Sequence, residues 1–126
     1  MTREPRRIGL TACSAALATL LVAVAVRTVA ADGFLSNVED LPLMSGLTED
    51  TASGLAFDTA DGRIVDAYAH GKVSREQVVS FYGETLPQLG WKVESATQFA
   101  RRGERLRLDF AQATDGLTVH YSLSPH

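Results

Sequence analysis

The sequence predicts an α+β fold, in which a hydrophobic N-terminal helix is followed by a two-layer domain with one amphipathic helix on a curved antiparallel sheet. Three observations support this prediction. One segment, residues 74–90, repeats its apolar residues at helical spacing. The segments on both sides of it alternate apolar and polar residues, as half-buried strands do. Asp-Gly pairs separate several of these segments, and such pairs are typical of tight hairpin turns.

The first 31 residues have the pattern of an export signal. Three arginines precede an apolar run over residues 8–26, and small residues follow at Ala30 and Ala31. A helix over the apolar run would be about 28 Å long, close to the ~30 Å hydrocarbon core of a bilayer. An uncleaved membrane anchor is therefore the alternative to a cleaved signal peptide. Both interpretations place the rest of the chain outside the cytoplasm, because basic residues stay on the cytoplasmic side.

We therefore expect a periplasmic or secreted protein, either soluble after cleavage or anchored to the inner membrane by residues 8–26. Two features of the leader are similar to other signals. The sequence before Cys13 is similar to a lipoprotein box, but the apolar run mostly follows the cysteine instead of preceding it, which disfavours lipidation. Arg6-Arg7 is similar to a twin-arginine signal, but a basic pair before an apolar run is also ordinary.

The remaining 95 residues, 32–126, suit one domain with a modest core. They carry eight Lys or Arg and fourteen Asp or Glu, a net charge of −6. This charge disfavours nonspecific binding to nucleic acid, which needs surplus cations. The lone cysteine, Cys13, lies in the leader, so the exported part has no disulfide, thiolate chemistry or cysteine metal site. We expect no cofactor.

Residues 32–53 are predicted to form an irregular lead-in to an α+β domain at residues 54–126. Pro42 and Gly46 argue against a long helix. The segment Leu41–Leu47 is nevertheless too apolar for a solvated linker. We expect it to form a loop or short turn packed on the edge of the domain.

The domain is predicted to have the order β-β-α-β-β-β. A hairpin turns at Asp61-Gly62, and Leu55 and Phe57 lie on one face before that turn. Three strands follow the helix, with turns near Gly103 and at Asp115-Gly116.

The helix has clear boundaries. Ser74 and Gln77 form a capping box at its start. Pro87 predicts a kink or a tightened last turn, and Gly90 suits a left-handed end. The buried stripe is predicted to contain Val78, Val79, Phe81, Tyr82, Leu86 and Leu89.

Three histidines are the candidates for chemistry. His70 and His120 could meet across the sheet and bind a metal, but no third ligand has suitable spacing. Ser122 lies two residues from His120 on the same strand face, so a hydrolase is conceivable, but no nucleophile elbow or glycine-rich loop is present. The sequence thus predicts no catalytic residue and no metal ligand.

The residues predicted to form an interaction surface are polar or aromatic. Four arginines cluster around Gly103, where they form either a solvated hairpin or a docking patch for an acidic partner. Tyr68 is the large aromatic residue expected on the exposed sheet face, and His120 lies on the polar side of the last strand. The proposed surface contains Tyr68, Arg101, Arg105, Arg107 and His120.

The stretch from Val78 to Trp91 has the form V-x-x-F-Y-x-x-x-L-x-x-x-G-W, and Pro42 and Gly46 supply an upstream P-x-x-x-G. This pattern resembles small exported bacterial domains and lipoproteins of unknown function. The resemblance covers about residues 41–123 and implies an exported domain, with no implied activity. The motif residues also have a purely structural explanation, because they fill and end a buried helix.

The expected function is that of an exported, non-enzymatic domain that contacts an unknown protein or envelope component. It would touch the inner membrane only through an uncleaved N-terminal segment. The alternative is a carrier of a small molecule or lipid, for which Ala67 and Ala69 would leave room between helix and sheet. A hydrolase that uses His120 and Ser122 is the least favoured possibility.

Overall fold

The computed structural model describes residues 2, 3, 9 and 31–126. The predicted hydrophobic helix over residues 8–26 lies, apart from Gly9, outside the described residues. Within the described part of the chain, no helix has the length and hydropathy needed to cross a membrane.

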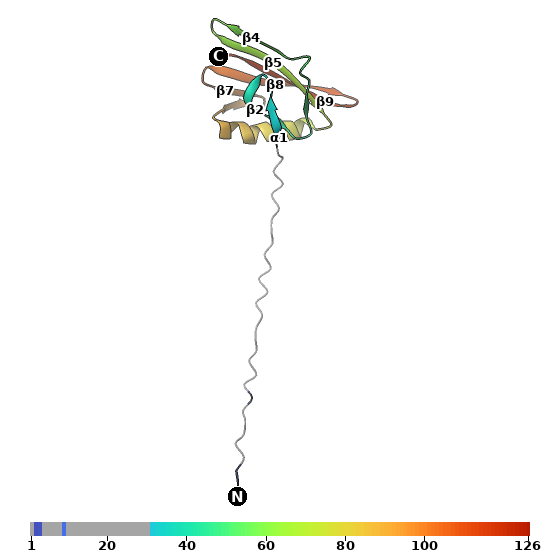
Figure 1. The fold of residues 1–126 in the computed structure, drawn as a ribbon, viewed down its shortest axis with the longest axis vertical. Helices are drawn as coiled ribbons and strands as arrows, with labels where there is room; N and C mark the ends of the chain where they lie inside the picture. The colour runs from blue at the N-terminus through green and yellow to red at the C-terminus, as the bar shows by residue number, and fades with distance from the viewer. Residues whose placement is uncertain (1, 4–8, 10–30) are drawn as a thin grey trace.

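The described residues form an α+β fold that is mostly antiparallel sheet (Figure 1). The helical elements are α1 (Arg75–Thr85) and the 3₁₀ turn η1 (Leu86–Leu89). The strands are β1 (Ala31–Leu35), β2 (Val38–Met44), β3 (Thr48–Glu49), β4 (Leu55–Thr59), β5 (Gly62–Gly71), β6 (Lys92–Ser95), β7 (Gln98–Arg101), β8 (Glu104–Ala113) and β9 (Gly116–Pro125).

The main sheet runs in the order β3-β5-β9-β8-β7-β6, and β4 pairs with β5 on the same edge as β3. Strands β1 and β2 form a separate hairpin. The pairing of β5 with β9 is the contact that joins the two halves of the chain, because β5 precedes the helix and β9 is the last strand. The other long ladder, between β8 and β9, is a local hairpin.

The predicted helix ends are confirmed. The Ser74 side chain accepts a hydrogen bond from the Gln77 N–H, and the Gln77 side chain accepts one from the Ser74 N–H. Leu86–Leu89 tightens into a 3₁₀ turn at Pro87, which has no N–H to continue the α-helix. Gly90 then ends the helix with φ at 89°.

Both Asp-Gly hairpins form, with their turns one residue earlier than predicted. Thr59 pairs with Gly62, so the two-residue loop is Ala60-Asp61. Ala113 pairs with Gly116, so the second loop is Thr114-Asp115. Each glycine therefore opens a strand instead of occupying the loop.

Four strands follow the helix instead of the three predicted. The apolar and polar residues after Trp91 belong to two short strands, because the chain reverses at Ala96-Thr97 and β6 pairs back on β7. The register of this pair is irregular between Val93 and Ser95. The Thr97 N–H donates to the Ser95 side chain at 3.3 Å within the turn.

The prediction that residues 32–53 are irregular is wrong, because most of them form strands β1, β2 and β3. Pro42 is tolerated in β2 because that strand pairs on one side only, in a two-stranded ribbon. The missing N–H of proline therefore removes no hydrogen bond from the middle of a sheet. The prediction that Leu41–Leu47 packs on the domain is confirmed, and more of residues 32–53 is buried than a contact at the domain edge would require. Its buried residues are Leu35, Val38, Leu41, Leu43, Met44 and Leu47.

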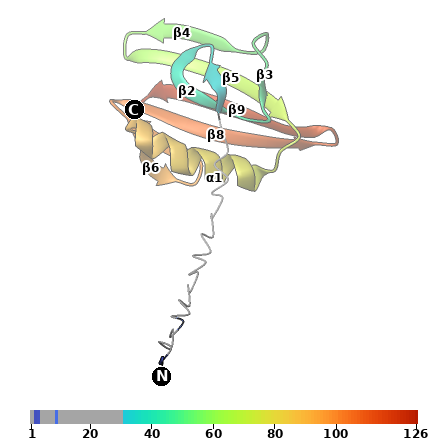
Figure 2. The same cartoon turned by 60° about the horizontal axis from the view of Figure 1, so that its bottom comes forward.

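The hairpin is needed because the helix is too short to cover the sheet. Strands β5, β8 and β9 each have 10 residues, about 33 Å, whereas α1 has 11 residues, about 16 Å. Figure 2 shows the β1–β2 hairpin and α1 on the same side of the sheet. We call this covered side the inner face and the opposite side the outer face.

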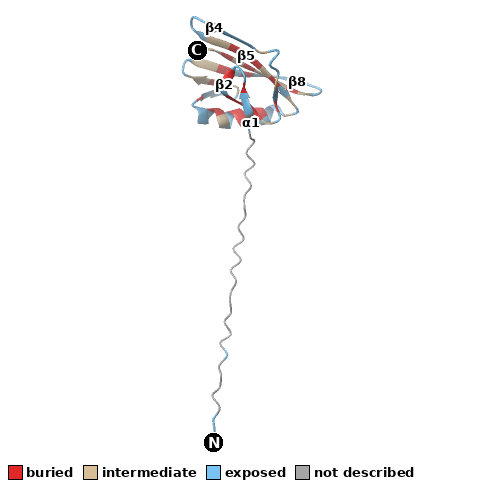
Figure 3. Ribbon diagram, in the orientation of Figure 1, coloured by how far each residue is buried: buried red, intermediate tan, exposed pale blue. Residues whose placement is uncertain are grey.

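Burial follows the alternation predicted from sequence (Figure 3). The inner face of the sheet contributes Val65, Ala67, Ala69, Phe99, Leu106, Leu108, Leu117, Val119, Tyr121 and Leu123. One predicted apolar contact is wrong, because Leu89 is 39% exposed. Leu55 and Phe57 share one face of β4, as predicted, and are 55% and 47% exposed. Leu89 is exposed because the 3₁₀ turn changes the direction of side chains after Leu86.

Two buried hydroxyl groups connect the three parts of the core. The Tyr82 hydroxyl of α1 donates to the Pro42 carbonyl oxygen of β2 at 2.8 Å. It lies 2.7 Å from the Tyr121 hydroxyl of β9. Because the Tyr82 proton is used on Pro42, Tyr121 is the donor of this second bond. The helix, the hairpin and the sheet are thus joined by one chain of hydrogen bonds.

Burial disfavours the charged form of both tyrosines. Desolvation raises the pKa of Tyr82 to about 12. Desolvation, followed by the charge on Tyr82, raises the pKa of Tyr121 as well. Both hydroxyls therefore stay protonated in the folded domain at neutral pH.

We expect the domain to lose stability as the pH rises from 10 to about 12. Tyrosines of the unfolded chain release their protons near pH 10, whereas the buried tyrosines of the folded domain keep theirs. The stability that the two protonated hydroxyls contribute is therefore complete below pH 10 and is lost between pH 10 and about 12. Each tyrosine contributes about 1.4 kcal/mol per pH unit there. Urea unfolding between pH 9 and 12 measures this slope. The slope should decrease in the Tyr82→Phe/Tyr121→Phe double variant, and an equal slope would contradict the assignment.

Candidate functional site

The outer face of the sheet is the candidate functional surface. Register places alternate residues of β5, β9 and β8 on this face. Within residues 31–126, the hairpin and α1 lie on the other side (Figure 2). The outer residues at its centre are Asp66, Tyr68, Arg107, Asp109, His120 and Ser122.

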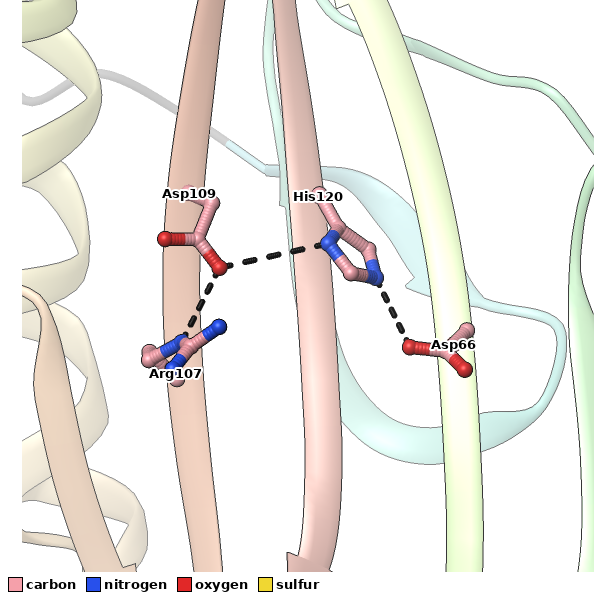
Figure 4. Close-up of polar contacts among 4 residues, drawn as sticks. All are labelled: Asp66, Arg107, Asp109 and His120. Atoms are coloured by element: carbon pink, nitrogen blue, oxygen red, sulfur yellow. Dashed lines mark hydrogen bonds and ion pairs between the residues drawn. The ribbon is translucent and has the colours of Figure 1, made fainter.

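His120 is the centre of the polar contacts on this face (Figure 4). Its Nε2 lies 2.7 Å from Asp66 Oδ1 on β5, and its Nδ1 lies 3.9 Å from Asp109 Oδ2 on β8. Arg107 Nε donates to Asp109 Oδ2 at 3.0 Å. The four side chains therefore form a line of polar contacts across three strands, with a carboxylate on each side of His120.

Tyr68 stacks on the His120 ring from the side of β5. The two residues are direct cross-strand partners, and their rings lie parallel within 6° with centroids 4.5 Å apart. Asp66 lies two residues before Tyr68, so one strand supplies both the stacked ring and the carboxylate. The imidazole is thereby held in a fixed orientation.

The protonation of one ring nitrogen follows from this geometry. A carboxylate only accepts hydrogen bonds, so His120 Nε2 carries a hydrogen and donates it to Asp66. The side chains of His120 and Asp66 are 27% and 33% exposed, so water screens the pair only partly.

An Asp–His pair is half of the arrangement used in nucleophilic catalysis, but the other half is not assembled here. The second nitrogen of His120 faces the Asp109 carboxylate, which has no proton for a histidine base to remove. Ser122 lies opposite Asp66 and Arg107 in the register, and its hydroxyl makes no hydrogen bond to His120. The described geometry therefore does not pair Ser122 with His120 as a nucleophile and its base.

The two candidate metal-binding histidines have different partners. His70 Nε2 lies 3.9 Å from Asp115 near the β8–β9 turn, whereas His120 contacts Asp66. Among the described residues, no group of three His, Cys, Asp or Glu side chains is arranged to hold a metal ion.

The predicted arginine cluster divides between the two faces. Arg101 lies over the Trp91 ring at 4.3 Å, donates to the Leu89 carbonyl and pairs with Asp40. Its side chain is 13% exposed, so it covers the edge of the core.

Arg105 and Arg107 lie on the outer face, in register with Ser124 and Ser122 of β9. Arg105 is half-buried beside Glu94 and His126. Of the predicted interaction residues, Tyr68, Arg105, Arg107 and His120 are thus together on one face, and Arg101 is not.

Sequence reasoning missed the two carboxylates that hold His120. Asp109 could have been found, because the Thr114-Asp115 loop fixes the β8–β9 register and places Asp109 opposite His120. Asp66 could not have been found in this way, because β5 and β9 are far apart in sequence and no turn sets their register.

No protein-family model matches the chain, and neither does any curated protein or solved structure.

We expect His120→Ala to lower the free energy of unfolding by about 1–2 kcal/mol, because it removes both the stack with Tyr68 and the donor to Asp66. His120→Phe should lose less, because a phenyl ring keeps the stack and leaves a carboxylate that water reaches. Denaturant unfolding of the two variants measures the difference. Wild-type stability in both variants would show that the polar contacts and the stack of His120 do not stabilise the sheet.

Proposed function

We propose that this protein is an exported, non-enzymatic domain that binds a protein of the bacterial envelope through the outer face of its sheet. The N-terminal pattern of arginines, apolar run and small residues supports export. The net charge of −6 over residues 32–126 argues against nucleic acid as the partner.

The observation that carries the proposal is the stack of Tyr68 on His120, fixed by Asp66, on the face opposite the helix and the hairpin. An aromatic side chain held rigid in this way loses little conformational entropy when it is buried by a partner. Tyrosine and arginine are also the residue types enriched at the centres of protein interfaces. Arg107 supplies the arginine beside this stack.

The other two functions receive less support. A carrier needs space beside Ala67 and Ala69, but these residues are 1% and 0% exposed, so protein atoms fill that space. A hydrolase that uses Ser122 needs its hydroxyl in contact with His120, whereas the side chains that contact this ring are Asp66, Asp109 and Tyr68.

Chemical cross-linking in the envelope of the host, followed by mass spectrometry, tests the proposal. The full chain is compared with Tyr68→Ala and Arg107→Glu. We expect the recovery of the cross-linked partner to fall at least tenfold in both variants, which corresponds to a loss of about 1.4 kcal/mol of binding free energy or more.

Matched controls change similar side chains outside the outer face. Phe34→Ala removes an aromatic residue that is 61% exposed on β1, and Arg102→Glu reverses an exposed charge in the β7–β8 turn. Both should recover the partner at the wild-type level. An unchanged set of partners in Tyr68→Ala and Arg107→Glu would refute binding through the outer face.

A further inference from the structure

Strand β4 is an unprotected edge of the sheet. It pairs with β5 on one side, and all five of its residues are exposed. Its register with β5 is continuous over the five pairs, so no bulge twists this edge away from a partner. It contains neither lysine nor proline, the residues that commonly block such edges.

The opposite edge, β6, is also exposed and paired on one side, but its sequence and its register differ from those of β4. It carries Lys92 and Glu94, and its register with β7 is irregular between Val93 and Ser95. Charged residues and irregular pairing discourage the addition of another strand. The sheet thus protects one edge and leaves the other open.

The Ala60-Asp61 loop fixes which backbone groups of β4 are free to pair. In a hairpin with a two-residue loop, the residues that flank the loop exchange hydrogen bonds, and the bonded pairs then alternate. Thr59, Phe57 and Leu55 therefore direct their N–H and C=O groups toward β5. Ala56 and Asp58 direct theirs away from the sheet.

The side chains of β4 add an apolar patch at this edge. Leu55 and Phe57 are cross-strand partners of Asp66 and Ile64, so they lie on the outer face. They are 55% and 47% exposed and are among the largest exposed apolar side chains in residues 31–126. Ala56 and Asp58 lie on the inner side, where Asp58 is opposite Arg63.

We propose that β4 pairs antiparallel with β4 of a second copy of this chain, about a twofold axis at Ala56. This register uses the free backbone groups of Ala56 in both copies. It places Leu55 of each copy opposite Phe57 of the other, so both exposed apolar residues are covered. Asp58 faces Gly54 of the other copy, so no like charges are directly opposed.

The strand is self-complementary in this register, which favours a second copy over an unrelated partner. Leu55 and Phe57 occupy adjacent positions on one face with a small residue, Ala56, between them. A twofold axis at Ala56 places Leu55 of each copy against Phe57 of the other copy. The sheets of the two copies become continuous, and their two His120 sites lie on the same outer surface.

Disulfide trapping tests the register in the full chain. All variants carry Cys13→Ser, which removes the lone native cysteine. Across the proposed axis the two Ala56 Cα atoms are about 5.5 Å apart, within the range that a disulfide spans. Ala56→Cys should therefore give a cross-linked dimer upon mild oxidation.

Asp58→Cys is the matched control, because it lies on the same strand, the same side and the same free edge. In the proposed register, residue 58 of one copy is displaced by four residues along the strand from residue 58 of the other. Their Cα atoms are then about 13 Å apart, which is too far for a disulfide. We expect at least ten times more dimer from Ala56→Cys than from Asp58→Cys. Equal yields from the two variants, no dimer from either, or a disulfide to a different protein would overturn the proposal.

Association is measured separately by sedimentation equilibrium. The Cys13→Ser protein should have twice the mass of a single chain, and Phe57→Lys should shift it to the single-chain mass. A single-chain mass before the Phe57 substitution, or a dimer that Phe57→Lys leaves intact, would also overturn the proposal.

Discussion

The hydrogen bonds that connect Tyr121, Tyr82 and Pro42 are the constraint on which the rest of the fold depends. They join the last strand, the helix and the N-terminal hairpin, which are separated by about 40 residues in sequence. In a buried site each hydroxyl needs a partner, so displacement of any one element leaves polar groups of the others unsatisfied. The hairpin and the helix are therefore fixed together against the inner face.

Because both covering elements lie on the inner face, the outer face keeps its polar residues and its backbone edge accessible. The side chains at its centre are nevertheless not loose, since His120 is held by Asp66 and Tyr68, and Asp109 by Arg107. A rigid polar surface next to an apolar edge at Leu55 and Phe57 supports the proposal that this face binds a partner. The aromatic residues of the helix motif, Phe81, Tyr82 and Trp91, are buried and belong to the core between the helix and the sheet.

The parts of the fold that could be predicted from sequence are those set by local interactions. The capping box at Ser74, the 3₁₀ turn at Pro87 and the left-handed Gly90 depend on neighbouring residues, and each is confirmed. The β1–β2 hairpin was not predicted because a proline and a short apolar run are not typical of a strand. The burial of this strand also depends on elements that are distant in sequence. The Asp66–His120 contact was missed for a related reason, since the β5–β9 pairing is set by the packed core and by no turn.

The central claim is that the hairpin belongs to the same cooperative core as the helix and the sheet. Native-state hydrogen exchange of the full chain tests it most directly, by comparing the amides of Leu41 in β2, Tyr82 in α1 and Val119 in β9. Because the Tyr121–Tyr82–Pro42 hydrogen bonds join the three elements, we expect all three amides to exchange only when the whole domain unfolds. The free energy of exchange should therefore equal that of global unfolding at each amide. Exchange of the β2 amide at a free energy several kcal/mol lower, with the helix and sheet still protected, would contradict the account.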